Sequence, residues 1–236
     1  DQPGFAERVR QLEPELDRDA LLARSLKDRP VVLGYYFTSD RDGRTSGVLP
    51  APVMQAEALG GRPILATRWD GYGANILPLA EAAPRAGFFN AVTSPDGVVR
   101  SLPLLAEHGG RYYESLSLAM FRMVLGSPGV EPGFPPERVV GRHYQALESV
   151  RLRQGASTLA IPVDDRVATL VPFRGSGGPQ GGSFTYLSAA DVLAGRVAPG
   201  LLADKIVLIG TTAPGLLDLR VTPVGETYPG VETHAS

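Results

Sequence analysis

Two stretches near the C-terminus decide the fold class: Tyr186-Leu187-Ser188-Ala189-Ala190-Asp191-Val192-Leu193 and Lys205-Ile206-Val207-Leu208-Ile209-Gly210. The first places a potential N-cap, Ser188, three residues before the acidic Asp191, which predicts a helix that runs to Ala194. The second is short and continuously apolar, which is typical of a strand buried on both faces. Helices that lie between buried strands indicate an α/β fold.

Upstream of these stretches, apolar periodicity predicts the same alternation of helices and strands. The run from Val31 to Phe37 predicts a buried strand, and before it five apolar residues recur at helical spacing, namely Leu12, Leu16, Ala20, Ala23 and Leu26. Further on we expect a short helix over 79–83, a strand over 86–92, a turn at 94–97, a returning strand over 98–105 and a helix over 114–125.

The second half of the chain begins with an expected linker over 126–147. Three short apolar stretches follow at 149–153, 158–162 and 168–174, and the turn residues between them predict an antiparallel meander. The full expectation is an α/β fold: a mixed sheet with helices packed on its faces and an antiparallel meander, in a single domain that spans residues 1–236.

Composition narrows the functional classes. The formal net charge of −2 gives no field that would gather nucleic acid. The absence of cysteine excludes disulfides, Cys-ligated zinc and cysteine nucleophiles, and we expect neither a metal nor a cofactor. No apolar run approaches the roughly 18–20 residues that cross a bilayer. The sequence starts abruptly at Asp1 and stops at Ser236 inside what looks like a new element, so we expect an excised soluble segment of a longer protein.

The order of several short motifs resembles the CHASE-type-2 family of bacterial sensor domains. The motifs are Gly87-Phe88-Phe89-Asn90 with Asp96–Leu104, then Tyr113–Ala119, the two stretches quoted above, and Tyr228–Ala235. Each motif is short, but together they follow the order and spacing of the family over most of the chain.

The resemblance implies a non-catalytic sensor on the extracytoplasmic, periplasmic face of a bacterial membrane. The parent protein would have one membrane helix before the sensor, usually three after it, and a cytoplasmic output domain. We expect an adenylate or guanylate cyclase output, with a histidine or serine/threonine kinase as the alternative. A homodimer and an unidentified small-molecule or protein stimulus are also expected. Family members open with a strand-helix-strand unit that residues 1–30 lack.

Candidate ligand-binding residues follow the apolar run 205–210. Thr211, Thr212 and Asp218 would lie beyond the carboxyl end of the expected strand, where open α/β sheets bind their ligands. Backbone N–H groups and the two hydroxyls would hold an anion there. The alternative is a strand-terminating turn in which the threonines bond to their own backbone.

Two other places offer candidate ligand contacts. Trp69 and Tyr72 lie in a glycine-rich stretch that either lines a ligand cleft or closes the core. Arg174 precedes the loop 175–182 and either clamps a carboxylate or forms a structural salt bridge. The loop lacks the Gly-Lys-Ser/Thr sequence of a phosphate-binding loop, which favours a plain surface loop.

The C-terminal segment 229–236 is the expected route of output. Pro229 is placed to begin a helix, and Val231, Glu232 and His234 would continue it toward a membrane helix. Glu232 and His234 also offer metal ligands, but no further histidine lies near them in the sequence. We therefore interpret these residues as the start of a helix rather than as a metal site.

Two hypotheses from other functional classes stay open. A soluble α/β hydrolase or transferase would use the loop 210–218, although neither a Gly-x-Ser-x-Gly nor a His-Glu-x-x-His motif occurs, and no catalytic residue is assigned. A module that only holds its parent protein in a dimer would have an extensive symmetric interface and no deep pocket.

Overall fold

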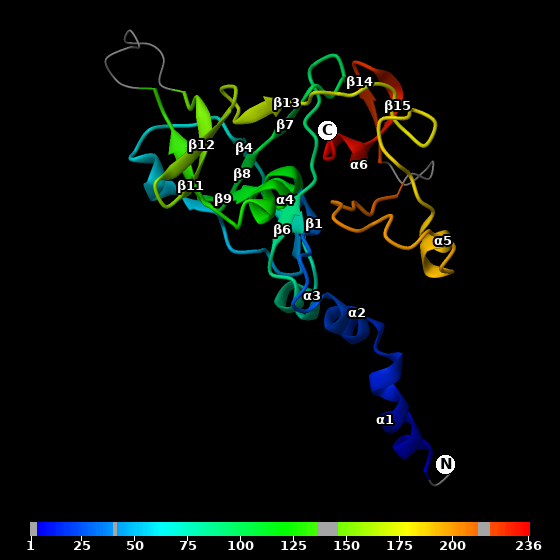
Figure 1. The fold of residues 1–236 in the computed structure, drawn as a ribbon. Helices are drawn as coiled ribbons and strands as arrows, with labels where there is room; N and C mark the ends of the chain where they lie inside the picture. Colours follow the sequence, from blue (N-terminus) through cyan, green and yellow to red (C-terminus); the bar gives the residue numbers. More distant parts are fainter. Residues whose placement is uncertain (1–3, 40–41, 136–145, 212–217) are drawn as a thin grey trace. The chain divides into compact units, whose positions relative to one another are not determined.

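The computed structural model describes residues 4–39, 42–135, 146–211 and 218–236. The chain divides into two compact units, here called unit 1 (Asp1–Asn90 with Pro103–Thr169) and unit 2 (Ala91–Leu102 with Leu170–Ser236). Figure 1 shows helices and several open sheets with both parallel and antiparallel strands. The predicted mixed α/β class is confirmed.

The helices of unit 1 are α1 (Phe5–Leu16), α2 (Arg18–Leu26), the 3₁₀ helix η1 (Ala56–Leu59), α3 (Leu77–Ala82) and α4 (Leu116–Val124). The helical spacing over 12–26 belongs to two helices rather than one. Asp17 separates them, because its side chain accepts a 2.9 Å hydrogen bond from the Ala20 N–H and caps α2. The predicted helices over 79–83 and 114–125 are confirmed as α3 and α4.

The first sheet of unit 1 is built around β1 (Leu33–Thr38). Its order is β2 (Thr45–Ser46), β5 (Gly71–Gly73), β1, β6 (Ala86–Phe88), and β1 runs antiparallel to β5 and parallel to β6. Tyr35 and Phe37 are buried whereas Tyr36 between them is exposed. The predicted strand is therefore confirmed, but it buries alternate side chains and not both faces.

The second sheet of unit 1 has the order β3 (Met54–Gln55), β9 (Arg111–Glu114), β8 (Leu105–His108), β4 (Thr67–Arg68). Helix α4 follows β9, and its N-cap Ser115 forms a β-bridge with Phe88 of the first sheet. Gly87 allows this approach, because a Cβ there would lie only 2.6 Å from the Leu116 nitrogen. Because Gly87 has no side chain, the backbone of β6 can contact the backbone at the start of α4.

The antiparallel sheet of unit 1 differs from the predicted meander. Its order is β10 (Gly129–Gly133), β11 (Ser149–Gln154), β12 (Ser157–Pro162). Strand β10 lies in the expected linker, and it pairs antiparallel with β11 on the side opposite to β12, so that β11 is the central strand. The third predicted strand is the short β13 (Ala168–Leu170), which does not pair with β12.

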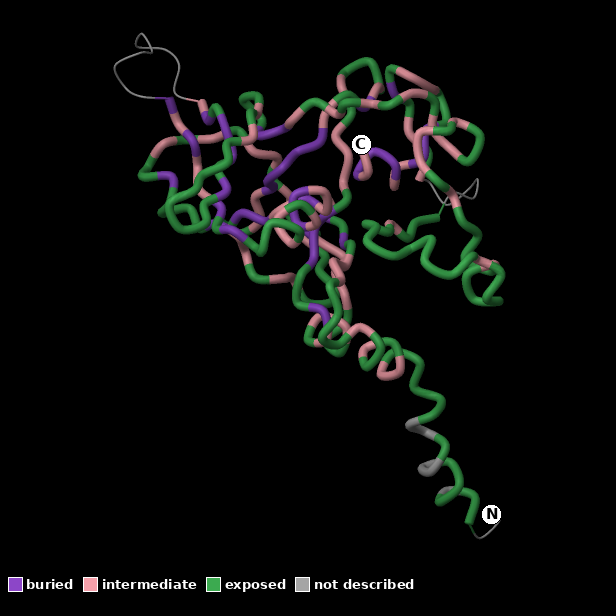
Figure 2. The backbone as a smooth tube through the Cα atoms, in the orientation of Figure 1, coloured by how far each residue is buried: buried purple, intermediate pink, exposed green. Residues whose placement is uncertain are grey.

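Two apolar cores form in unit 1, and both draw on the second sheet. One surrounds Leu105, Leu118 and Val150, and the other surrounds Phe37 and Phe88. Figure 2 shows strands β6 and β8, which contribute to these cores, as largely buried, whereas α1 is exposed. Apolar burial of this kind contributes about 25 cal/mol for each Å² removed from water, so the two cores dominate the stability of unit 1.

Unit 2 has fewer regular elements, namely α5 (Ala189–Leu193), β14 (Leu219–Thr222), β15 (Gly225–Pro229) and α6 (Gly230–Thr233). Strands β14 and β15 form an antiparallel hairpin, and the Val99 N–H donates a 2.8 Å hydrogen bond to Val221. The chain passes between the units within β7 (Ser101–Pro103) and β13. The predicted helix over 188–194 is confirmed as α5.

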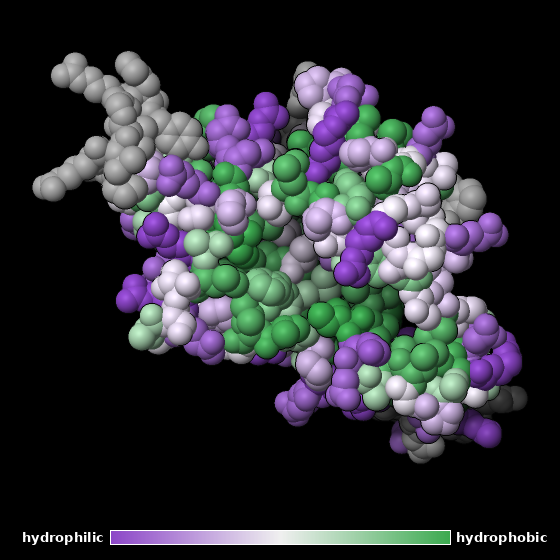
Figure 3. Space-filling view, turned by 45° about the horizontal axis from the view of Figure 1, so that its top comes forward, coloured by the Kyte–Doolittle hydropathy of each residue, from purple (hydrophilic) through white to green (hydrophobic). Residues whose placement is uncertain are grey.

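The expectation that 205–210 forms a buried strand is wrong. The run has no regular structure, and Ile206 and Ile209 are 61% and 93% exposed. Within the described residues no strand pairs with it, so its side chains have no sheet face to pack on. Figure 3 shows exposed apolar side chains, drawn in green, on the face of the molecule that it presents. In the described ranges, no helix combines the length and apolarity needed to cross a membrane.

Candidate functional site

The β8–β9 hairpin of unit 1 borders a polar hollow of about 330 Å³. Gly109 and Gly110 form its tight turn with positive φ angles, which places His108 and Arg111 opposite each other in the strand register. Strand β5 supplies Tyr72 from the first sheet. The hollow is lined by Leu49, Pro50, Pro52, Tyr72, His108, Gly109, Arg111 and Tyr113.

The imidazole of His108 is held on three sides. Its Nδ1 lies 2.9 Å from the Trp69 carbonyl oxygen, and because a carbonyl only accepts, Nδ1 carries the proton and donates. The Tyr72 ring meets the imidazole edge to face at 5.3 Å, and the Phe37 ring lies 5.8 Å away. This arrangement leaves Nε2 as the nitrogen available to a ligand.

The charge next to the hollow is positive. Glu107 on β8 is already neutralised, because its Oε2 lies 3.2 Å from Arg68 Nε and its Oε1 accepts a 2.7 Å hydrogen bond from the Gly110 N–H. Arg111 forms no ion pair with any carboxylate in the described part of the chain. The Arg111 guanidinium, without an ion pair among the described residues, therefore lies beside a histidine and two tyrosines.

The two aromatic residues predicted from the sequence as ligand contacts, Trp69 and Tyr72, differ in their position relative to the hollow. Tyr72 lines the hollow, whereas Trp69 is not among its lining residues. Both rings are half-buried against the core around Phe37. Sequence reasoning missed His108 and Arg111. The signal available was a Gly-Gly turn with an ionisable residue on each side of it.

In unit 2, the C-terminal segment 229–236 starts as predicted. Helix α6 begins after Pro229, and Glu232, Thr233 and His234 are all buried, with Glu232 only 3% exposed. Val231 is half-buried. The segment is therefore packed into unit 2 along most of its length rather than free in solvent.

The C-terminal segment packs against the loop 175–182. The Gly178 N–H donates a 2.9 Å hydrogen bond to Glu232 Oε1. A Cβ at Gly177 would lie 2.6 Å from the Tyr228 ring and 2.9 Å from Glu232 Oε2, so only glycine fits there without a shift. The Tyr228 ring also packs edge to face on Phe173 at 5.1 Å. The glycine-rich loop thus has a structural role, because the C-terminal segment packs against it.

Two further ionisable groups face the same segment. Burial is the main cause that raises the pKa of the Tyr186 phenol above its usual range, and the carboxylate of Glu232 adds to that rise. Burial also raises the pKa of Asp218, while the Arg220 charge and the Val231 N–H act in the opposite direction. The Asp218 carbonyl accepts a 2.6 Å hydrogen bond from the Gly230 N–H. Asp218 therefore serves the start of α6.

The structure describes only part of the anion site expected beyond 205–210. The supporting strand is absent, Thr211 is exposed, and Thr212 lies outside the described residues. Arg174 is exposed and pairs with no carboxylate in the ranges that the structure describes; its Cζ lies 6.0 Å from the centre of the Phe184 ring. Ligand contact by Thr211, Thr212, Asp218 and Arg174 stays a prediction.

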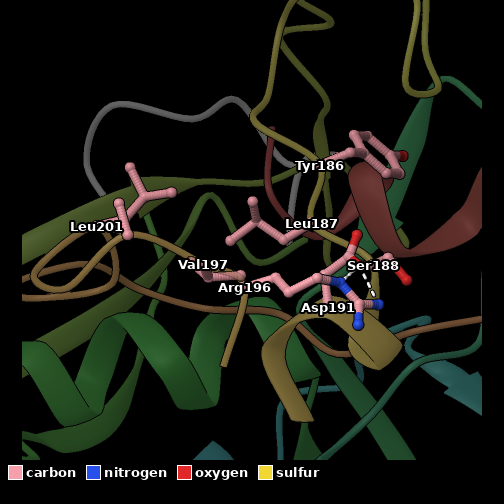
Figure 4. Close-up of a pocket in the computed structure, with 8 residues that line it drawn as sticks. Tyr186, Leu187, Ser188, Asp191, Arg196, Val197 and Leu201 are labelled. Carbon is pink, nitrogen blue, oxygen red and sulfur yellow. Dashed lines mark hydrogen bonds and ion pairs between the residues drawn. The ribbon is translucent and has the colours of Figure 1, made fainter. Parts of the chain in front are cut away.

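A second hollow, of about 430 Å³, lies beside α5 in unit 2 (Figure 4). Its charged residues neutralise each other, because Arg196 Nη2 lies 2.6 Å from Asp191 Oδ1 and Nε donates to the same oxygen at 2.8 Å. Figure 4 shows the guanidinium turned to that carboxylate. This hollow offers a ligand less unpaired charge than the one in unit 1. Across the described residues, no three His, Cys, Asp or Glu side chains gather as metal ligands do.

Comparison with known protein families gives one finding. A family model, that of the CHASE2 domain, matches residues 4–236 and so covers both units. No match was found among curated proteins or among solved structures. The resemblance that the short motifs carry is confirmed.

Proposed function

This chain belongs to the CHASE2 family, whose members are extracellular sensory domains of membrane signalling proteins and not catalytic domains, and on that premise we propose how it works. The chain senses a stimulus on the periplasmic face of a bacterial membrane. It regulates a cytoplasmic adenylate or guanylate cyclase through rearrangement of a homodimer. A histidine or serine/threonine kinase is the alternative output.

The observation that carries the proposal is the docking of the C-terminal segment 229–236. Glu232 is buried and bonded to Gly178, so the segment that leads out of the domain is coupled to a loop of unit 2. A stimulus can shift such an equilibrium only by its difference in affinity between the docked and released arrangements. The Glu232–Gly178 contact belongs to the docked arrangement, and breaking it would give the released one.

Helix α1 supports the homodimer. Phe5, Val9, Leu12 and Leu16 follow one another at spacings of four, three and four residues, and their exposed fractions are 68%, 47%, 44% and 64%. This spacing is the apolar seam of a coiled coil, whose natural partner is the same helix of a second copy. A seam of this length binds weakly in free solution, but membrane anchoring raises the effective concentration. We therefore assign α1 as a contact between the two copies.

Cysteine crosslinking in the membrane-bound parent protein tests both parts, since residues 1–236 contain no cysteine. Leu12→Cys is expected to crosslink between copies, whereas Glu15→Cys, on the same helix outside the seam, is the matched control. Ala235→Cys reports on the C-terminal segment, and its crosslinking is expected to change when output is switched. Equal crosslinking at Leu12 and Glu15 would contradict the seam, and unchanged crosslinking at Ala235 would contradict the coupling.

No observation favours the hydrolase hypothesis. It requires convergent polar groups in the loop 210–218, yet Thr211 is exposed and Asp218 bonds to the start of α6. Polar groups do converge in the hollow of unit 1, which lies outside this loop.

A further inference from the structure

We infer that the hollow beside the β8–β9 turn binds a small organic carboxylate, with Arg111 as the residue that takes the carboxylate group. This inference deepens the sensory function proposed above by naming the chemical class of the stimulus. It stands on the geometry and charge of the hollow, and on nothing in the C-terminal segment.

The size and lining of the hollow suit a small molecule. A volume of about 330 Å³ is at the lower end of ligand sites in proteins. Leu49, Pro50 and Pro52 provide apolar surface, while His108 and Arg111 provide polar groups. An apolar wall with a few placed polar groups is the common pattern of organic-ligand sites.

The charge of the hollow selects an anion. Arg111 has no carboxylate partner in the described residues, and the two acids near it in sequence are both engaged: Glu107 by Arg68 and the Gly110 N–H, and Glu114 by Arg122. A guanidinium presents two parallel N–H donors that match the two oxygens of a carboxylate. A bound carboxylate would therefore supply the ion-pair partner that Arg111 lacks among the residues that the structure describes.

The apolar wall separates an organic carboxylate from an inorganic anion. Sites for free phosphate gather several backbone N–H donors. At this turn the Gly110 N–H is already used by Glu107. The hollow thus combines a guanidinium that has no ion pair in the described ranges with a surface of leucine, proline and tyrosine, which suits a ligand with a charged end and an apolar body.

His108 would position the ligand rather than neutralise it. Its Nδ1 proton is committed to the Trp69 carbonyl, and the ring is held by Tyr72 and Phe37. The Nε2 atom can accept a hydrogen bond from a hydroxyl of the ligand when the ring is neutral and donate to an oxygen when it is charged.

Ligand binding to the 1–236 domain tests the inference with benzoate as the probe. Benzyl alcohol replaces the carboxylate with a neutral group, and inorganic phosphate keeps the charge without the apolar body. Benzoate is expected to raise the melting temperature and to give a saturable titration by calorimetry, and neither other compound should do so. Equal shifts with benzoate and benzyl alcohol, or binding of phosphate alone, would overturn the assignment.

Three variants locate the site. Arg111→Gln is expected to weaken benzoate binding at least about tenfold, the usual scale for loss of a charge-assisted pair. Arg111→Lys keeps the charge but not the two parallel N–H donors, so its affinity for benzoate should lie between those of Arg111→Gln and the wild type. Arg166→Gln, an exposed arginine that does not line the hollow, is the matched control. Unchanged affinity in Arg111→Gln, with wild-type unfolding in the absence of ligand, would refute the site.

Failure here is distinguishable from failure of the sensory proposal. The crosslinking at Leu12 and Ala235 needs no ligand in the hollow. Absence of benzoate binding together with stimulus-dependent crosslinking would overturn the carboxylate site alone.

Discussion

The side chain of Asn90 pairs with the backbone of Phe37 as a neighbouring strand would. Its Oδ1 accepts a 2.7 Å hydrogen bond from the Phe37 N–H, and its Nδ2 donates a 2.9 Å hydrogen bond to the Phe37 carbonyl. Strand β6 ends at Phe88, so Asn90 extends the pairing of β1 beyond the last residue of its parallel partner. Phe37 in turn contacts His108, which links this amide to the candidate ligand site.

Asn90→Asp tests this pairing. The carboxylate would keep the acceptor for the Phe37 N–H but lose the donor, and it would face the Phe37 carbonyl with a negative charge. We expect a loss of about 1–3 kcal/mol in the free energy of unfolding. Asn75→Asp is the control, because Asn75 donates only one longer bond, of 3.3 Å, to Gly34. Urea unfolding measures both, and an equal loss in the two variants would contradict the role of Asn90.

Gly177→Ala tests the packing of the C-terminal segment. The added methyl would lie within 3 Å of the Tyr228 ring, Pro229 and Glu232, so the loop or the segment must move. We expect a loss of about 1–3 kcal/mol, the usual cost of overpacking. Gly225→Ala is the matched control, since its Cβ would meet no atom within 4 Å. Faster amide hydrogen exchange at 229–236 in Gly177→Ala alone is the expected readout, and equal exchange in both variants would contradict it.

The exposed Asp96–Arg100 pair predicts a pH dependence. The Arg100 guanidinium, 2.7 Å away, and the Val98 N–H lower the pKa of Asp96 to about 2. A carboxyl whose pKa is lower in the folded chain stabilises the fold above its unfolded pKa, and this contribution disappears as the pH falls through the folded value. The wild type should therefore be more stable than Asp96→Asn above about pH 4.

Melting temperatures of the wild type and Asp96→Asn between pH 7 and pH 2 measure this dependence. The difference should shrink toward pH 2, and it should also be reduced by salt because both side chains are exposed. Asp165→Asn, another exposed loop aspartate, serves as control. A difference that stays constant down to pH 2 would exclude the ion pair as its source.

The Glu114–Arg122 pair, in contrast, is mostly buried. Its atoms are 2.6 Å apart, the two side chains are 13% and 16% exposed, and burial raises the pKa of Glu114 even though Arg122 acts to lower it. Glu114→Gln would leave the Arg122 charge without its carboxylate. We expect a loss of about 2–4 kcal/mol for this variant.

A double variant separates the lost ion pair from the stranded charge. Glu114→Gln with Arg122→Met removes both charges and should be more stable than Glu114→Gln alone. Glu131→Gln is the control, because its partner Arg153 is exposed and 3.6 Å away, and its effect should be under about 1 kcal/mol. A double variant less stable than the single one would show that loss of the ion pair itself, and not the unpaired Arg122 charge, causes the destabilisation.

Local signals in the sequence predicted the elements that depend on local interactions. The Asp96-Gly97 turn closes with a 2.8 Å bond from the Gly97 N–H to Ser94, α4 begins at the N-cap Ser115, and α6 follows Pro229. Caps and turns satisfy their hydrogen bonds within a few residues. Such elements can therefore be read from the order of residues alone.

The elements that were missed depend on distant partners. Strand β10 pairs with β11 about twenty residues further along and contains Pro132, which made its segment look like a linker. Apolar continuity predicts a buried strand over 205–210, yet a strand also needs a neighbouring strand to pair with. His108 and Arg111 were missed because their significance comes from Tyr72, which another strand brings to them.

The fit of Gly177 against Tyr228 also bears on how this family can diverge. These positions are about fifty residues apart, and a Cβ at position 177 would lie 2.6 Å from the Tyr228 ring, so a side chain does not fit at 177 while Tyr228 stays in place. A larger residue at 177 would therefore need a residue smaller than tyrosine at 228. Correlated substitution of these two positions among homologues would be the evolutionary trace of that constraint.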